Sequence, residues 1–133
     1  ISGFNQITMA QWPDRTFNVK FESRSDASED HDFVLSLLSG PTDLVGLYVS
    51  GMGNRTVLRA LAATGKGNLV VIGHEYTPHS RTALLAGQFD AVIALDMQEA
   101  AQRMVDAAMG KRQGWDRALD AKIIMRENLP ALD

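Results

Sequence analysis

The chain of 133 residues is long enough for about one domain with a sizeable core. Hydrophobic residues make up 45% and charged residues 22%, the balance of an ordinary globular protein. The formal net charge of −3 argues against a nucleic-acid-binding surface on this segment, which would normally be basic. No apolar run approaches the roughly 18 residues of a membrane-spanning helix, and the absence of cysteine excludes disulfides and thiolate metal sites.

The N-terminal residues predict a helix that ends at Trp12-Pro13. Phe4 and Ile7 are three residues apart and are expected to face inward. The chain opens at Ile1 as though inside a helix already under way, so we expect it to be a fragment of a longer protein.

The next two predicted elements are a strand and a helix. Residues 16–22 alternate between apolar and polar side chains, which is typical of a half-buried strand. A helix is expected from about Glu29, because acidic residues in a first turn favour the helix dipole. Gly40-Pro41 ends it.

Two strand–helix units follow at similar spacing. Residues 44–50 predict a strand, and residues 54–64 predict a helix after it. Residues 69–73 predict the next strand, and a second helix is expected to begin at Thr77-Pro78 and to end at Gly87. Such repeats form parallel sheets, which bind ligands beyond the carboxyl ends of their strands.

The last predicted elements complete an α/β pattern of about five strands and five helices. Residues 91–95 predict a strand. The following helix is capped by Asp96 and is expected to bury Met104 and Val105. Residues 122–126 predict the final strand.

Polar residues at the first of these strand ends are candidate ligand-binding groups. They are Ser50, Asn54 and Arg55. The turn Gly51-Met52-Gly53 between strand and helix can direct backbone N–H groups at a ligand, or its glycines can simply allow a tight turn. Asn54 can line a cleft, cap the helix, or do both.

His74 and Glu75 follow the second strand directly. The Glu75 carboxylate can accept hydrogen bonds from two ligand hydroxyls, or can be a solvated loop acid, and His74 can be a surface residue. A zinc-protease helix is excluded, because His74 and His79 are five residues apart instead of four and Pro78 interrupts a helix. No nucleophile elbow surrounds Ser50.

An ordered set of short motifs resembles a known family. The motifs are Ile1-Ser2-Gly3-Phe4, residues 46–55, Val71-Ile72-Gly73-His74-Glu75, residues 81–87, residues 90–94 and Arg126-Glu127-Asn128-Leu129-Pro130. Together they resemble the carboxyl-terminal lobe of a periplasmic-binding-protein-like domain, and in particular the effector domain of lactose-repressor (LacI/GalR) family transcription regulators. The resemblance covers the whole chain.

The resemblance implies a Rossmann-like, three-layer α/β lobe with a mainly parallel sheet, and residues 1–133 would be one such lobe. It implies a cytoplasmic, homodimeric repressor that binds a sugar-like effector between two lobes and operator DNA through an N-terminal domain absent from this chain. Glu75 matches the position where the family commonly has an aspartate that binds sugar hydroxyls.

Two other functions remain as alternatives. A periplasmic sugar-binding protein of a transporter has the same kind of lobe. A doubly wound α/β enzyme is less favoured, because no nucleophile–base pair, metal-ligand set or cofactor fingerprint occurs in the sequence. We therefore expect a non-enzymatic protein without a cofactor or metal.

Overall fold

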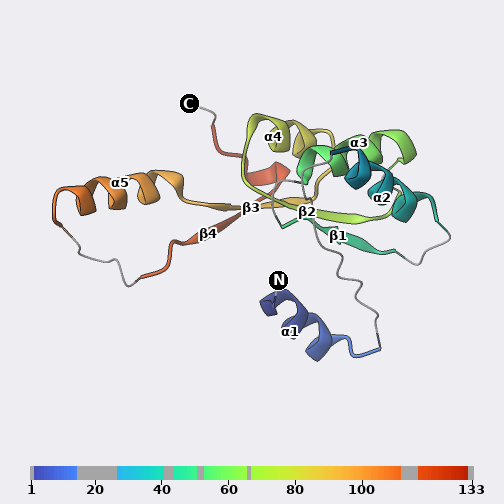
Figure 1. The fold of residues 1–133 in the computed structure, drawn as a ribbon, viewed down its shortest axis with the longest axis horizontal. Helices are drawn as coiled ribbons and strands as arrows, with labels where there is room; N and C mark the ends of the chain where they lie inside the picture. Colours follow the sequence, from blue (N-terminus) through green and yellow to red (C-terminus); the bar gives the residue numbers. More distant parts are fainter. Residues whose placement is uncertain are drawn as a thin grey trace.

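The computed structural model describes residues 2–14, 27–40, 44–50, 53–65, 67–111 and 117–131. Its helices and strands alternate through most of the chain (Figure 1). In chain order they are α1 (Ser2–Gln11), α2 (Ala27–Ser39), β1 (Gly46–Tyr48), α3 (Asn54–Thr64), β2 (Val70–His74), α4 (Pro78–Leu85), β3 (Ala91–Leu95), α5 (Met97–Ala108), β4 (Ala121–Ile124) and a 3₁₀ turn at Arg126–Asn128. The strand expected at 16–22 lies outside the described residues.

The four described strands form one mainly parallel sheet in the order β1-β2-β3-β4. β1 pairs with β2 and β2 pairs with β3 in parallel, which confirms the α/β fold expected from the repeated strand–helix units. β4 runs antiparallel to β3, with Leu95 opposite Ala121 and Val92 opposite Ile124. The carboxyl ends of β1, β2 and β3 therefore meet at one edge of the sheet.

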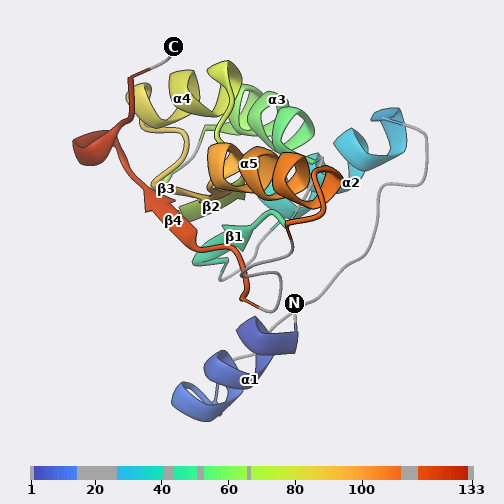
Figure 2. The ribbon, with the colours of Figure 1, turned by 90° about the vertical axis from the view of Figure 1, so that its left-hand side faces the viewer.

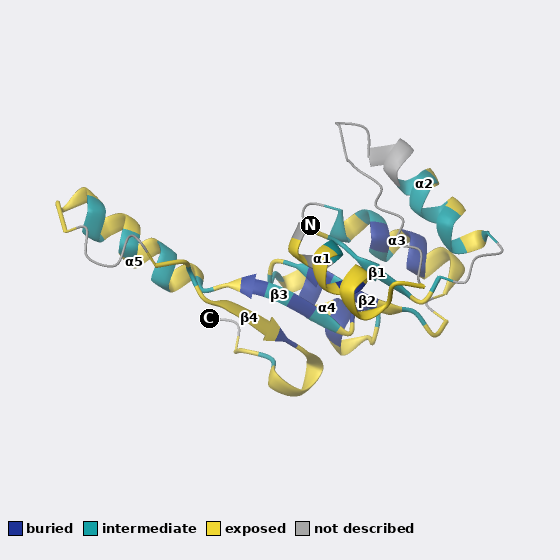
Figure 3. Cartoon of the chain, turned by 90° about the horizontal axis from the view of Figure 1, so that it is seen from below, coloured by how far each residue is buried: buried dark blue, intermediate teal, exposed yellow. Residues whose placement is uncertain are grey.

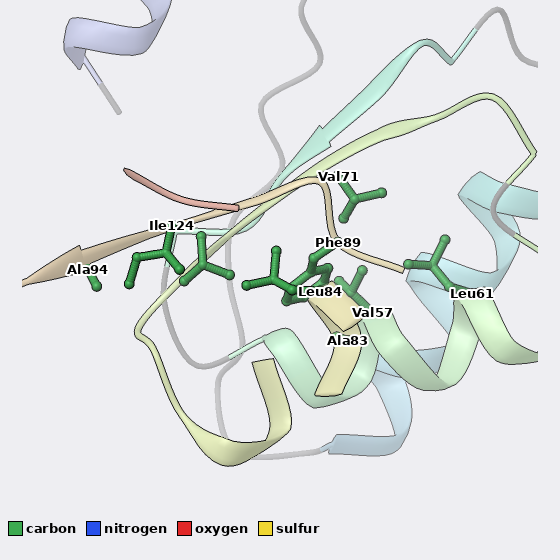
Figure 4. Close-up of a cluster of buried hydrophobic side chains, with 9 residues drawn as sticks. Val57, Leu61, Val71, Ala83, Leu84, Phe89, Ala94 and Ile124 are labelled. Atoms are coloured by element: carbon green, nitrogen blue, oxygen red, sulfur yellow. The ribbon is translucent and has the colours of Figure 1, made fainter. Parts of the chain in front are cut away.

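One face of the sheet packs against α3 and α4 and holds the core (Figure 4). Val57 and Leu61 of α3 are buried, and Leu58 is partly buried against them. The core cluster as a whole comprises Val57, Leu61, Val71, Ala83, Leu84, Phe89, Val92, Ala94 and Ile124. α2 packs on α3 from outside, and α1 lies on the opposite side of the sheet from α3 and α4 (Figures 1 and 2).

The start and end of α4 follow the local sequence signals. The Thr77 side chain accepts a hydrogen bond from the Ser80 backbone N–H, and the Ser80 hydroxyl accepts one from the Thr77 N–H. Pro78 occupies the first turn, where it removes no helical hydrogen bond. Gly87 follows the helix with a φ of 69°, a conformation that favours glycine.

Neither α1 nor α5 packs extensively against another described element. The expectation that Ile7, Met104 and Val105 face inward is wrong, since their exposed fractions are 58%, 60% and 57%. Figure 3 shows α5 extending from the sheet without buried residues. These segments form helices as their periodicity predicts, but the described chain supplies no surface to cover their apolar sides. Within the same residues, no helix is both long and apolar enough to cross a bilayer.

α5 is tied to the sheet by an exposed charged pair. Asp96 caps the helix, since its Oδ1 accepts a hydrogen bond from the Glu99 N–H at 3.0 Å. Its Oδ2 accepts a hydrogen bond from Lys122 Nζ on β4 at 2.7 Å. Lys122 and then the Glu99 N–H lower the pKa of Asp96, and the bond to Asp96 raises the pKa of Lys122.

Two side chains, those of Phe89 and Asn54, approach β2 closely at Gly73, near the carboxyl end of the strand. A Cβ at this position would lie 2.8 Å from Cε2 of Phe89 and 3.0 Å from Oδ1 of Asn54. Phe89 belongs to the buried core, and Asn54 begins α3. The missing side chain therefore lets the core and α3 close on β2 at this point.

We expect Gly73→Ala to lower the free energy of unfolding by about 1–3 kcal/mol, because the added methyl group overlaps the Phe89 ring. Urea denaturation followed by circular dichroism measures the change. Gly53→Ala is the matched control, since its Cβ would meet only Val49 Cγ1 at an ordinary 3.4 Å. Equal stability of the two variants would contradict the close approach at Gly73.

We expect Lys122→Ala to raise the pKa of Asp96, because the lysine is the largest cause of its lowering. A lowered folded pKa stabilises the fold above the unfolded value, and this contribution is lost as pH falls through the folded value. In the variant this contribution should therefore be smaller near neutral pH, and acidification should remove less stability than in the parent chain. NMR titration of the Asp96 carboxyl carbon measures the pKa, with Lys111→Ala as a control. An unchanged Asp96 titration would contradict the pair.

Candidate functional site

Polar groups gather where β1 and β2 end. Tyr48 is the last residue of β1, His74 is the last residue of β2, and Glu75 follows it. The register pairs Tyr48 with Ile72, and His74 with Ile93 of β3. Because side chains alternate along a strand, Tyr48 and His74 project from the face of the sheet opposite the buried core.

A direct contact joins the two ring side chains. The Tyr48 hydroxyl and His74 Nε2 form a hydrogen bond of 2.5 Å, whose donor depends on the histidine tautomer. The rings lie 5.3 Å apart between centroids at an interplanar angle of 75°. Both residues are half-buried, so the pair is held in place and still reaches solvent.

Asn54 fixes α3 to the end of β2. Its Nδ2 donates a hydrogen bond of 2.5 Å to the His74 carbonyl. Gly53 occupies the N-cap position and makes no side-chain cap, so the expectation that Asn54 caps the helix is wrong. The Asn54 Oδ1 is buried and has no hydrogen-bond partner among the described residues. The amide thus holds the strand end in position, while its role in ligand binding stays a prediction.

Glu75 has an unusual backbone and a free carboxylate. Its φ of 68° makes it the one non-glycine residue with positive φ among those described. The Glu75 N–H donates to the Ile93 carbonyl at 2.9 Å, and the Ser80 hydroxyl donates to the Glu75 carbonyl at 2.8 Å. The residue is exposed, and no described residue bonds to its carboxylate. Strained residues held this way cluster at binding sites.

The other candidates lie around this edge on exposed positions. Ser50 is exposed two residues beyond β1, and Gly51 and Met52 lie outside the described residues. Arg55, in the first turn of α3, approaches His79 in the first turn of α4, where Arg55 Nη2 donates to His79 Nε2 at 3.4 Å. Binding of a ligand by Ser50 or Arg55 stays a prediction.

This arrangement suits recognition of hydroxyl groups more than metal binding. The Glu75 carboxylate offers two acceptor oxygens, the tyrosine hydroxyl can donate and accept, and a neutral histidine ring has one donor nitrogen and one acceptor nitrogen. Over the described part of the chain, no set of three or more histidine, cysteine, aspartate or glutamate side chains is arranged to hold a metal ion.

A family model matches most of this chain. The model describes a periplasmic binding protein domain, and its match covers residues 1–114. The chain belongs to this family. The periplasmic-binding-protein-like fold that the sequence motifs implied is therefore confirmed, as a single lobe.

The lobe is also similar to solved structures. A chain of the "XylFII-LytSN complex" superposes with a TM-score of 0.78 at 16% sequence identity, covering 97% of this lobe and 47% of that chain. A chain of a point mutant of the same complex gives 0.68 at 19% identity, covering 95% and 46%. The lobe thus spans about half the length of these structures. No curated protein sequence matches it.

Sequence reasoning did not identify Tyr48 as a site residue. Tyr48 lies within the strand predicted at residues 44–50, which is mainly apolar, so the sequence pattern draws attention only to the polar residues at the end of that strand. Its pairing opposite Ile72, two residues before His74 on the neighbouring strand, brings the two side chains together. The sequence did contain a signal for Tyr48. Its hydroxyl is polar, and it lies two residues before Ser50, near the end of a strand that was expected to face a ligand.

We expect Glu75→Gly to be more stable than Glu75→Ala. Both variants lose the carboxylate, but alanine keeps the left-handed strain, which costs about 1–2 kcal/mol. Greater freedom of glycine in the unfolded chain offsets roughly 0.5–1 kcal/mol of the gain. Urea denaturation of the two variants isolates the backbone effect. A glycine variant no more stable than the alanine variant would show that the backbone at this position is relaxed.

Proposed function

We propose that this lobe forms half of a cleft that binds a small polyhydroxylated molecule, such as a sugar or sugar derivative. The observation that carries the proposal is the Glu75 carboxylate, which is exposed and unpartnered among the described residues, on a backbone held at positive φ. It stands at the carboxyl edge of parallel strands, where α/β proteins bind ligands. Family membership favours binding over catalysis.

Glu75 is the principal ligand-binding group in this proposal. Its carboxylate accepts hydrogen bonds from adjacent ligand hydroxyls, each contributing about 1.5–3 kcal/mol. The Tyr48–His74 pair supplies a second polar contact from the next strand. Asn54 acts as a positioning residue through the His74 carbonyl, and Ser50 and Arg55 line the rim.

We further propose that the lobe serves in a cytoplasmic, homodimeric repressor of the lactose-repressor family. The order of motifs along the chain supports this assignment. An effector that contacts both lobes shifts the protein toward one lobe orientation, and the orientation sets operator affinity through a DNA-binding domain outside this chain. Such coupling works only through different affinities for the two states, and it is typically about 1–3 kcal/mol.

A periplasmic sugar-binding protein is the second candidate. The description of the family model, a periplasmic binding protein domain, supports this candidate and the repressor about equally. The two candidates differ in DNA binding. A gel-shift assay of the complete gene product on the DNA upstream of its own gene separates them, because only the repressor retards the DNA and releases it with effector.

We expect Glu75→Gln to weaken effector affinity about 10- to 150-fold, the equivalent of roughly 1.5–3 kcal/mol, because the amide loses the charge and one acceptor. A thermal-shift screen of the complete protein against sugars, sugar acids and polyols identifies the effector. Isothermal titration calorimetry then compares the variant with the parent protein.

Asp106→Asn is the control for this experiment, because it removes one carboxylate charge near the far end of α5, away from the strand tips. Operator binding without effector should be equal in all three proteins. Effector affinity that is unchanged in Glu75→Gln would exclude Glu75 from the cleft.

A further inference from the structure

Tyr76 links the candidate site to the last described residues of the chain. It follows Glu75 directly, and its hydroxyl donates a hydrogen bond of 3.0 Å to the carbonyl of Pro130, 54 residues later. Its ring is half-buried and packs against the hydrophobic core. Residues 126–130, which we call the C-terminal turn, therefore lie beside the start of α4 (Figures 1 and 2). The proposed function makes no use of this contact.

The C-terminal turn is itself fixed to the sheet. The Asn128 Oδ1 accepts a hydrogen bond from the Met125 N–H at 2.6 Å, and its Nδ2 donates to the Ile123 carbonyl at 3.0 Å. Ile123 belongs to β4, which pairs with β3. Leu129 then packs against the core. The carbonyl of Pro130 is therefore an acceptor at a defined position.

Glu75 needs support from its surroundings, because a positive φ is unfavourable for a residue that carries a side chain. Its N–H is bonded to the Ile93 carbonyl, and its own carbonyl accepts from the Ser80 hydroxyl. Tyr76 is the first residue after the strained position, and its contacts with the core and with Pro130 hold the chain there. Loss of the tyrosine hydroxyl removes one of the restraints that oppose relaxation of the Glu75 backbone.

We propose that Tyr76 is a positioning residue for Glu75, and that the C-terminal turn helps to hold the Glu75 backbone at positive φ through the Tyr76–Pro130 hydrogen bond. The contacts form a continuous path, in which Asn128 fixes the turn to β4 and the turn fixes the tyrosine hydroxyl. A substitution in the turn therefore changes the presentation of the Glu75 carboxylate without touching a ligand. The importance of this path for binding rests on the proposed function, whereas the path itself does not.

The test is amide hydrogen exchange of the Glu75 N–H, measured residue by residue by mass spectrometry on the complete gene product without any ligand. We expect about fivefold faster exchange in Tyr76→Phe, the factor for losing one hydrogen bond that restrains the site. The ring remains, so the amides of β3 should exchange as in the parent protein. Thr82→Val is the matched control, because it removes another exposed hydroxyl-to-carbonyl bond, of 2.9 Å to Pro78 in α4, and should leave the exchange of Glu75 unchanged.

Asn128→Ala tests the other end of the path. It should give the same increase at Glu75, and adding it to Tyr76→Phe should give no further increase, because both changes act through one contact. Unchanged exchange of Glu75 in both single variants would overturn the proposal. An equal increase at the amides of β3 would also overturn it, because the variants would then only lower the stability of the whole lobe. Ligand binding by Glu75 is tested separately with Glu75→Gln, so either inference can fail while the other stands.

Discussion

The structure of this lobe depends on the close approach of two side chains to Gly73. The Phe89 ring occupies the space where a Cβ would stand, and Asn54 reaches past the same point to the His74 carbonyl. One glycine thus lets the hydrophobic core and the start of α3 meet on a single strand. Packing within the lobe therefore sets the position of His74. The candidate site is built directly on the hydrophobic core.

Glu75 shows how a stable fold can hold an unfavourable local conformation. The backbone on both sides of its Cα is bound, on one side to β3 and on the other to the buried hydroxyl of Ser80. Those bonds are made by main-chain groups, so they leave the carboxylate unconstrained. A glycine would satisfy the same backbone without strain. The presence of a glutamate there favours a functional reason for the side chain.

Much of the fold could be predicted because its signals are local. Thr77 and Gly87 act through their own neighbours in sequence, and the strand–helix repeats indicate a parallel sheet. The features that could not be predicted depend on contacts between residues far apart in the sequence. Periodicity correctly predicted a helix around Val105 but could not show that the described chain lacks a surface to bury it. Tyr48 belongs to the site only through strand register, and the positive φ of Glu75 follows from bonds to distant residues.

The starts of α4 and α5 have a practical consequence for solution conditions. α4 begins with neutral hydroxyls, whereas α5 begins with a carboxylate bonded to an exposed ammonium group. Dissolved salt screens charges near a protein surface and leaves neutral hydrogen bonds almost unaffected. Raising the ionic strength should therefore loosen the anchoring of α5 while the start of α4 keeps its shape. A spectroscopic label on α5 would then report increased motion as salt is added, while a label on α4 would not.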